Sequence, residues 1–257
     1  MGLPSTITRQ LACIVIAFCN LTVVLAAGLV AAGEESGATH DEKHTRLEHS
    51  PTLGAKPPKG AVVLFDGKSL DAWRHWDLDD ELFWQTDNGE LVANEGNIVT
   101  HRQFTDYKLH VEFLIPAVKT VKPQQRKSGV FLHGKYYEIQ IADSFGDNVS
   151  HASCGGVYFR LAPLQRASLP AGKWQTFDIT FHAPRLNNQR RVSHPARLTL
   201  LHNGITVHDN ARIPEEGVIR DPEFAKPAGI VLEDQDFPVR FRNIWVVDLA
   251  TSERLPK

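Results

Sequence analysis

The amino-acid sequence predicts an all-β sandwich or jelly roll. From Gly60 onward, short runs of alternating apolar and polar residues follow one another, separated by turn residues. Asn203-Gly204 lies between two such runs and is a strong signal for a two-residue hairpin. No segment shows a long apolar repeat of 3.6 residues, and no internal repeat suggests a propeller.

The predicted strands are short runs with alternating or β-branched apolar residues. In chain order they are 62–65, 82–86, 90–93, 107–115, 129–133, 137–142, 156–159, 174–182, 197–202, 205–208, 229–233 and 239–249. In 107–115 the residues from Tyr107 to Ile115 alternate clearly, and every second one should face the core. In the last strand we expect Phe241, Trp245 and Val247 on the core face.

The N-terminus predicts an exported protein. Arg9 precedes an apolar run, Leu11–Ala32, that ends in Val30-Ala31-Ala32, small residues suited to cleavage. We therefore expect a signal peptide over residues 1–32 and a secreted or periplasmic protein, with no stable membrane insertion after cleavage. The run is also long enough for an uncleaved membrane anchor, which is the alternative.

The rest of the chain divides by composition. Residues 33–59 are rich in Gly, Glu, Lys, His and Pro and predict a flexible linker, before one domain over 60–250 and a tail over 251–257. Cys154 is the only cysteine after residue 32, so no disulfide is expected within the mature chain. The formal charge of −2 gives no reason to expect nucleic acid as a partner.

Candidate site residues occur in strand 137–142. Glu138 and Gln140 should lie on the face opposite Ile139, and one bulge residue would return Asp143 to that polar face. Two carboxylates with an amide between them suit acid/base chemistry on a sheet surface. The alternative is an ordinary half-buried strand with its polar side in water.

Several other strands also carry polar side chains on one face, among them Glu112 and Arg242. If these strands are neighbours of 137–142, their polar faces form one surface that suits sugar hydroxyls. Otherwise these are unrelated solvent-facing positions.

Six ordered motifs resemble the 3-keto-disaccharide hydrolase domain family over roughly residues 60–250. They are Leu64-Phe65-Asp66-Gly67-Lys68-Ser69-Leu70-Asp71-Ala72-Trp73, Ser128-Gly129-Val130-Phe131, Tyr137-Glu138-Ile139-Gln140-Ile141-Ala142-Asp143, Trp174-Gln175-Thr176, Asn203-Gly204 and Phe241-Arg242-Asn243-Ile244. The resemblance implies a concanavalin-like jelly roll in a secreted or periplasmic carbohydrate-active protein.

One segment departs from the family pattern. Where the family carries LQ-x-HG, this chain has Leu232-Glu233-Asp234-Gln235-Asp236, so that Gln235 replaces the histidine. Histidine can titrate near neutral pH and glutamine cannot. Activity could therefore be lost or changed, or the acidic residues of this segment could supply a different polar set.

The resemblance implies a glucosyl substrate oxidised at C3, whose ketone acidifies the C2 proton. A base removes that proton, the group at C1 leaves, and water then adds. We expect Glu138 as the base, Asp143 as the second carboxylate and Arg242 as the group that stabilises negative charge. Gln140, Glu112, Gln235 and Asp234 would bind the 3-keto-glycoside or oligosaccharide. A divalent metal bound by carboxylates could replace Arg242, and the metal is left open.

Two other functions stay open. Glu138 to Asp143 is similar to the E-x-D-x-x-E strand of laminarinase-type glycoside hydrolases, with two of its three acidic positions changed. A non-catalytic carbohydrate-binding module is the other alternative, with Trp73, Trp76 and Trp84 as aromatic platforms.

Overall fold

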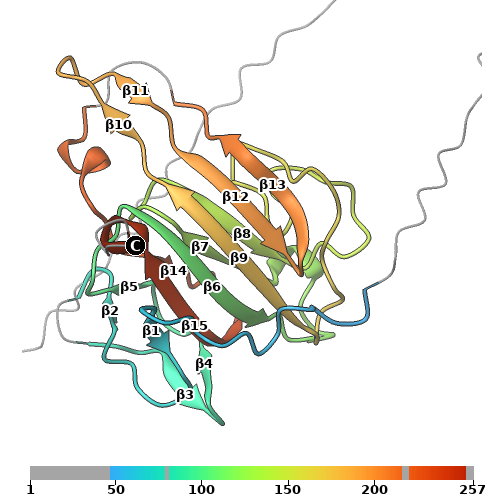
Figure 1. Cartoon of the computed structure of the whole chain (residues 1–257). Coiled ribbons are helices and arrows are strands. Elements are labelled where there is room, and N and C mark those ends of the chain that lie inside the picture. Colours follow the sequence, from blue (N-terminus) through green and yellow to red (C-terminus); the bar gives the residue numbers. More distant parts are fainter. Residues whose placement is uncertain (1–46, 79–80, 216–219, 253–257) are drawn as a thin grey trace, which may run out of the picture. The chain divides into compact units, whose positions relative to one another are not determined.

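The structure, a computed structural model, describes residues 47–78, 81–215 and 220–252. The predicted signal peptide, the first part of the predicted linker and the end of the tail lie outside these residues. Within the described part, no helix is long and apolar enough to cross a membrane. The fold is an antiparallel β-sandwich, which confirms the predicted class (Figure 1).

The larger sheet, called sheet A, has eight strands. Its order is β13-β12-β9-β6-β15-β4-β3, and β1 also pairs with β15. The bounds are β1 Val62–Phe65, β3 Gln85–Asp87, β4 Glu90–Val92, β6 Asp106–Leu114, β9 Trp174–His182, β12 Arg197–His202, β13 Ile205–Arg212 and β15 Arg240–Asp248. The hairpin between β12 and β13 turns at Asn203 and Gly204, both with positive φ, as the sequence predicts.

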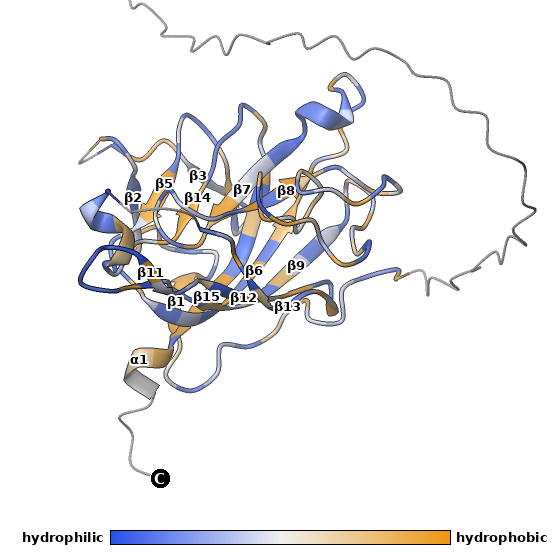
Figure 2. Ribbon diagram, turned by 90° about the horizontal axis from the view of Figure 1, so that it is seen from above, coloured by the Kyte–Doolittle hydropathy of each residue, from blue (hydrophilic) through white to orange (hydrophobic). Residues whose placement is uncertain are grey.

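The smaller sheet, called sheet B, has five strands in the order β2-β5-β14-β7-β8. The bounds are β2 Trp73–His75, β5 Ile98–Thr100, β7 Lys127–Phe131, β8 Glu138–Ala142 and β14 Val231–Leu232. A separate hairpin joins β10 (Arg185–Leu186) and β11 (Val192–His194), and the helical turns are η1 (Pro123–Gln125), η2 (Pro222–Ala225) and α1 (Leu249–Ser252). The view from above shows the two sheets as separate layers (Figure 2).

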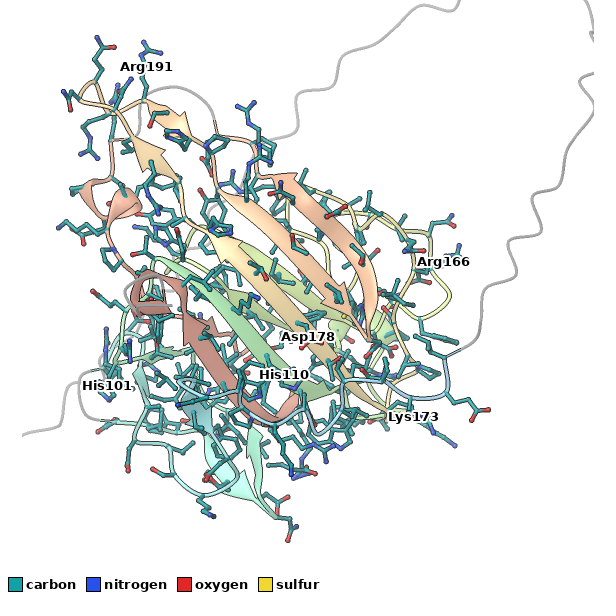
Figure 3. All side chains as sticks on the ribbon, viewed as in Figure 1. His101, His110, Arg166, Lys173, Asp178 and Arg191 are labelled. Atoms are coloured by element: carbon teal, nitrogen blue, oxygen red, sulfur yellow. The ribbon has the colours of Figure 1, made fainter. Side chains whose placement is uncertain are left out.

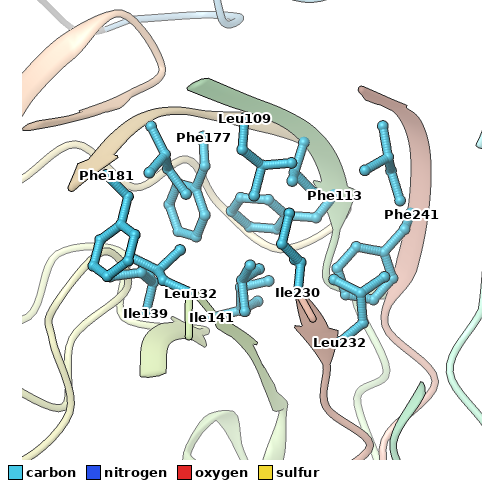
Figure 4. Packing of buried hydrophobic residues seen from close by; sticks show 14 of the residues in the cluster. Leu109, Phe113, Leu132, Ile139, Ile141, Phe177, Phe181, Ile230, Leu232 and Phe241 are labelled. Carbon is cyan, nitrogen blue, oxygen red and sulfur yellow. The ribbon is translucent and has the colours of Figure 1, made fainter. Parts of the chain in front are cut away.

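The core lies between the inner faces of the two sheets (Figure 4). Phe113, Phe177 and Phe241 of sheet A face Ile141 and Leu232 of sheet B, and all five are fully buried. Burial of each such side chain stabilises the fold by roughly 1.5–3 kcal/mol. The packing also fixes strand register, because a shift by one residue would turn these side chains into water.

The core side of β15 differs from the prediction. β15 pairs Arg242 with Glu112 and then Trp245 with His110, so two residues oppose one between these pairs. Asn243 occupies this β-bulge with φ 45°. The bulge turns Ile244 and Val246 into the core and Trp245 outward. The expectation that Trp245 and Val247 face the core is therefore wrong, whereas Phe241 does face it.

Residues 50–55 cross the outer face of sheet A (Figure 1). The Ser50 hydroxyl lies 2.7 Å from the Thr176 hydroxyl, and the Thr52 hydroxyl donates to Asp178 at 2.8 Å. At the other end, the Ala55 carbonyl accepts hydrogen bonds from Asn243 and Trp245. We call residues 50–55 the N-terminal strap. It falls inside the predicted linker 33–59 but is bound to β9 and β15.

Candidate functional site

Two carboxylates converge on the outer face of sheet B. Glu138 lies on β8, and Glu233 follows β14, with β7 between these strands. A Cβ atom added at Gly129 of β7 would lie 3.1 Å from Glu138 Oε1 and 2.9 Å from Glu233 Oε2. The space above Gly129 is therefore filled by both carboxyl groups, and any larger residue would displace them.

The electrostatics of this pair are unusual. Burial, and then the charge of Glu233, raise the pKa of Glu138 to about 7. Burial also raises the pKa of Glu233, against the effect of its hydrogen bond with Gln235. Oε1 of Glu138 is buried and receives no hydrogen bond from an N–H or O–H donor of the described residues. Because the neighbouring carboxylate can only accept, a proton shared between Glu138 and Glu233 satisfies both.

Two polar side chains complete the pair. The Gln235 side-chain amide donates to Glu233 Oε2, and Lys127 of β7 lies close enough for its charge to lower the pKa of both glutamates. A cavity of about 550 Å³ adjoins them, lined by Thr120, Val121, Gln124, Gln125, Lys127, Gln235, Asp236 and Phe237. Amide and hydroxyl groups in such a cavity suit a ligand with many hydroxyl groups.

The segment after β14 carries Asp236 where the resembled family has glycine. Asp236 has φ 56°, the left-handed conformation that glycine adopts without cost. The resembled family segment carries glycine at this position, and here Asp236 adopts a conformation that is open to glycine without strain. Asp234 stabilises the turn, because its carboxylate accepts hydrogen bonds from the backbone N–H groups of Gly96 and Asp236. Its expected role in substrate binding stays untested.

The polar residues that were predicted to form one row along β8 have different contacts in the structure. Glu138 and Gln140 do lie opposite Ile139, which is fully buried. The Gln140 side chain is buried as well, and its amide donates to the carbonyls of Ser128 and Ile141. Asp143 is bound by Arg126 at 2.8 Å. Five residues of extended strand place Asp143 on the order of 16 Å from Glu138.

Glu112 and Arg242 lie on the other sheet. They pair across β6 and β15 on the outer face of sheet A, with Arg242 Nε 2.7 Å from a Glu112 oxygen. The Arg242 guanidinium also lies 4.0 Å from the ring centroid of Trp174. The core separates them from Glu138, so the structure does not bring Arg242 and Glu112 into one site with the pair on sheet B.

The outer face of sheet A carries a second buried polar cluster (Figure 3). His110 Nδ1 lies 2.6 Å from Asp178, and its Nε2 lies 3.6 Å from Glu112. Burial alone would lower the pKa of His110, but the hydrogen bonds to Asp178 and Glu112 raise it. Burial alone would raise the pKa of Glu112, but hydrogen bonds from His110, Asn243, Arg242 and the backbone of Gly54 lower it to about 2. The N-terminal strap covers this cluster. The groups that His110 and Glu112 contact therefore belong to the chain itself.

The described residues give little support to Cys154 as a nucleophile or to a bound metal ion. Burial raises the pKa of Cys154 to about 12, which keeps its thiol neutral. Within residues 47–78, 81–215 and 220–252, no group of three or more His, Cys, Asp or Glu side chains is arranged to hold a metal ion.

Glu233 was expected only as one of the acidic residues that could supply an alternative polar set, and Lys127 was not predicted as a site residue. Glu233 follows a strand of two residues, and nothing in its local pattern shows which neighbour it meets. The available signal was Gly129, because glycine inside a strand often marks a close approach of another group. Lys127 flanks the same glycine on the same face of β7.

The two antiparallel sheets place this domain in the jelly-roll class of β-sandwiches. The chain belongs to the 3-keto-alpha-glucoside-1,2-lyase-like domain family, which matches residues 60–247. This confirms the resemblance that the sequence motifs carry. The chain has no match among curated proteins.

Three similar crystal structures come from Parabacteroides distasonis ATCC 8503, and each carries the provisional name glycosyl hydrolase. The first is 30% identical, with a TM-score of 0.67 over 75% of this chain and 85% of the other. The second is 18% identical, with a TM-score of 0.53 over 74% and 94%. The third is 22% identical, with a TM-score of 0.52 over 74% and 99%, and these last two support the fold alone.

Proposed function

We propose that this protein cleaves the glycosidic bond of glucosides oxidised at C3, by elimination followed by addition of water. The observation that carries the proposal is the convergence of the Glu138 and Glu233 carboxyl groups over Gly129, next to Lys127 and Gln235, which line a polar cavity. The family to which the chain belongs, described as 3-keto-alpha-glucoside-1,2-lyase-like, supports the same chemistry.

The pair suits this reaction because it holds one base and one acid near neutral pH. In the proposed first step, Glu138 removes the proton from C2, and the electron pair forms an enolate with the C3 ketone. The enolate then collapses, the C1–O bond breaks, and the leaving oxygen takes a proton from Glu233 or from water. Water finally adds across C1 and C2, which restores the 3-keto sugar with a free hydroxyl at C1.

The proposal gives the stabilisation of the enolate to Lys127 rather than Arg242. Lys127 lies near both carboxylates, whereas Arg242 is paired with Glu112 on the opposite sheet. A cation near the developing oxyanion lowers the barrier without any proton transfer. Gln235 would orient Glu233 through the hydrogen bond between their side chains.

Direct hydrolysis by a retaining mechanism fits this geometry less well. A retaining glycosidase needs its two carboxyl groups about 5–5.5 Å apart, on either side of the bond that is cleaved. Here the two carboxyl groups lie side by side over one glycine, and the charge of Glu233 raises the pKa of Glu138. Such a pair works as a single acid/base unit on one face of the sugar.

The test compares the wild-type protein, Glu138→Gln and the control Glu223→Gln on glucosides oxidised at C3 and on their unoxidised parents. Glu223 is exposed and pairs with Lys226, so its substitution removes a carboxylate outside the site. We expect the wild type and the control to cleave only the oxidised compounds, and Glu138→Gln to lose at least about 10²-fold in kcat. Cleavage of unoxidised glucosides would favour direct hydrolysis, and binding without any cleavage would favour a carbohydrate-binding module.

Export is part of the proposal, and its support comes from the sequence alone. The apolar run Leu11–Ala32 ends in small residues that suit cleavage. Mass spectrometry of the exported protein should place the mature N-terminus close to Gly33. An intact Leu11–Ala32 segment would instead support a membrane anchor.

A further inference from the structure

An exposed aromatic group lies beside Glu138, on the side away from Glu233. The backbone from Gly155 to Tyr158 runs along the free edge of β8, where Val157 pairs with Ile139. Tyr158 N–H donates to the Glu138 carbonyl at 2.9 Å, and Gln140 N–H donates to the Gly156 carbonyl at 2.9 Å. Tyr158 is therefore directly opposite Glu138, and both side chains are on the outer face of the sheet.

Phe159 extends this group into solvent. Its side chain is 77% exposed, the largest exposure among the large apolar side chains of the described residues. Its ring centroid lies 4.2 Å from that of Tyr158 and 5.3 Å from that of His151, with the His151 ring nearly parallel. Three aromatic rings thus form a continuous surface beside the catalytic pair.

The backbone of Phe159 has an unfavourable conformation. Its φ is 57°, a region that a bulky residue rarely adopts, and the ring is nevertheless directed into water. A hydrogen bond from Phe159 N–H to His151 Nδ1, at 3.2 Å, holds this turn in place. A strained backbone that presents an exposed aromatic ring is typical of a ligand site.

We propose that Tyr158, Phe159 and His151 form an aromatic subsite that binds the sugar ring on the leaving-group side of the scissile bond. The inference rests on the proposed function, because it concerns the same substrate. The polar cavity at Lys127 and Gln235 suits the ring that carries the ketone, since its amides and lysine can bind hydroxyl and carbonyl oxygens. The aromatic surface lies across Glu138 from this cavity and can stack against the apolar face of the second ring.

The substrate class follows from this arrangement. Glycosides whose leaving group is another sugar ring or a similarly flat ring should bind better than those with a small leaving group.

The experiment uses two probes, a glucose disaccharide and methyl glucoside, each oxidised at C3, with full-length wild type, Phe159→Ala and Leu164→Ala. Leu164 is a matched control, because it is 69% exposed but lies beside β13, where its N–H donates to Val207. We expect Phe159→Ala to raise KM for the disaccharide about tenfold, with kcat and the methyl glucoside kinetics unchanged. Leu164→Ala should leave the kinetics of both probes unchanged.

Equal effects of Phe159→Ala on both probes, or no effect on either, overturn the subsite while the proposed function stands.

If the wild type cleaves neither probe, the proposed function has failed. A second measurement then tests the aromatic subsite separately. Saturation-transfer NMR then follows binding of the unoxidised disaccharide to the wild type and to Phe159→Ala. Saturation of one sugar ring that disappears in Phe159→Ala supports the subsite. A signal that is the same in both proteins, or absent from both, overturns it.

Discussion

Glu138 and Glu233 approach each other across a full strand of sheet B because the residue between them, Gly129, has no side chain. The pair therefore depends on three strands at once.

Glu233→Gln should move the pH dependence of activity toward lower pH. The charge of Glu233 helps to raise the pKa of Glu138 to about 7, so an uncharged neighbour lets Glu138 ionise at lower pH. If ionised Glu138 is the base, kcat/KM of the wild type rises as pH increases through about 7. In Glu233→Gln this rise should occur at lower pH. A profile with an unchanged midpoint would show that Glu233 does not act on Glu138.

Gly129→Ala should impair catalysis more than it impairs folding. The new Cβ would lie 2.9 Å from Glu233 Oε2 and 3.0 Å from Glu138 Cγ, so the two carboxyl groups must separate. We expect kcat to fall by about 10²-fold, with a small change in melting temperature, because both side chains lie at the outer face and can move outward. Kinetics and thermal unfolding measured on one preparation test this. Full activity in a folded Gly129→Ala protein would contradict the shared-proton arrangement.

Asp143→Asn should reduce stability and leave turnover within a few-fold of wild type. Asp143 is bound by Arg126, whose guanidinium also donates to the carbonyls of Val118 and Val121. Loss of this partly buried ion pair should cost roughly 1–3 kcal/mol in unfolding free energy. Urea denaturation measures the cost, and Glu138→Gln is the comparison that should show the opposite pattern. A loss of turnover in Asp143→Asn equal to that of Glu138→Gln would restore Asp143 as a catalytic carboxylate.

Glu112→Gln should make unfolding less dependent on pH in the acid range. The folded-state pKa of Glu112 is about 2, below its usual 4.5, so the ionised group stabilises the fold above pH 4.5. That stabilisation is lost as pH falls from about 4.5 toward 2. The wild type should therefore lose stability steeply in this window, and Glu112→Gln should start less stable and decline less. Denaturation midpoints between pH 2 and 7 test this, with the exposed Glu81→Gln as control.

Removal of the N-terminal strap should destabilise the domain. A chain that begins at Lys56 lacks the hydrogen bonds of Ser50, Thr52, Gly54 and Ala55 and exposes the cluster around His110. At roughly 0.5–1.5 kcal/mol for each hydrogen bond, we expect a loss of about 2–5 kcal/mol relative to a chain that begins at Thr45. Equal melting temperatures for the two chains would show that the strap contributes no stability.

Much of the fold could be predicted from the sequence because long strands of the sandwich bury one face. The alternation in β6 and β9 and the Asn203-Gly204 turn placed these elements correctly. The pattern was insufficient for β2 and β5, which have three residues each and no clear period. It also failed at β15, because a single bulge residue, Asn243, inverts the alternation after it.

The site was harder to predict than the fold because it depends on strand order. Glu138 could be selected from its own strand, but its partner Glu233 is 95 residues away in the chain and reaches it only because β7 lies between β8 and β14. Arg242 and Glu112 were assigned to the same surface since both are polar and outward-facing. Outward-facing residues of the two sheets point in opposite directions, and a one-dimensional pattern does not distinguish them.

The N-terminal strap has a consequence for the order in which the domain can fold. Its partners include Thr176, Asn243 and Trp245, and the contact between Ala55 and Trp245 spans 190 residues. Because a nascent chain emerges from its N-terminus, these partners do not yet exist when the strap leaves the ribosome. The strap residues are thus synthesised first but are among the last in the domain to reach their final positions. The strap can make all of its contacts only after β15 has been synthesised. A chain that stops before β15 lacks the two hydrogen bonds of the Ala55 carbonyl, so this end of its strap is more accessible to proteases that act on incomplete chains.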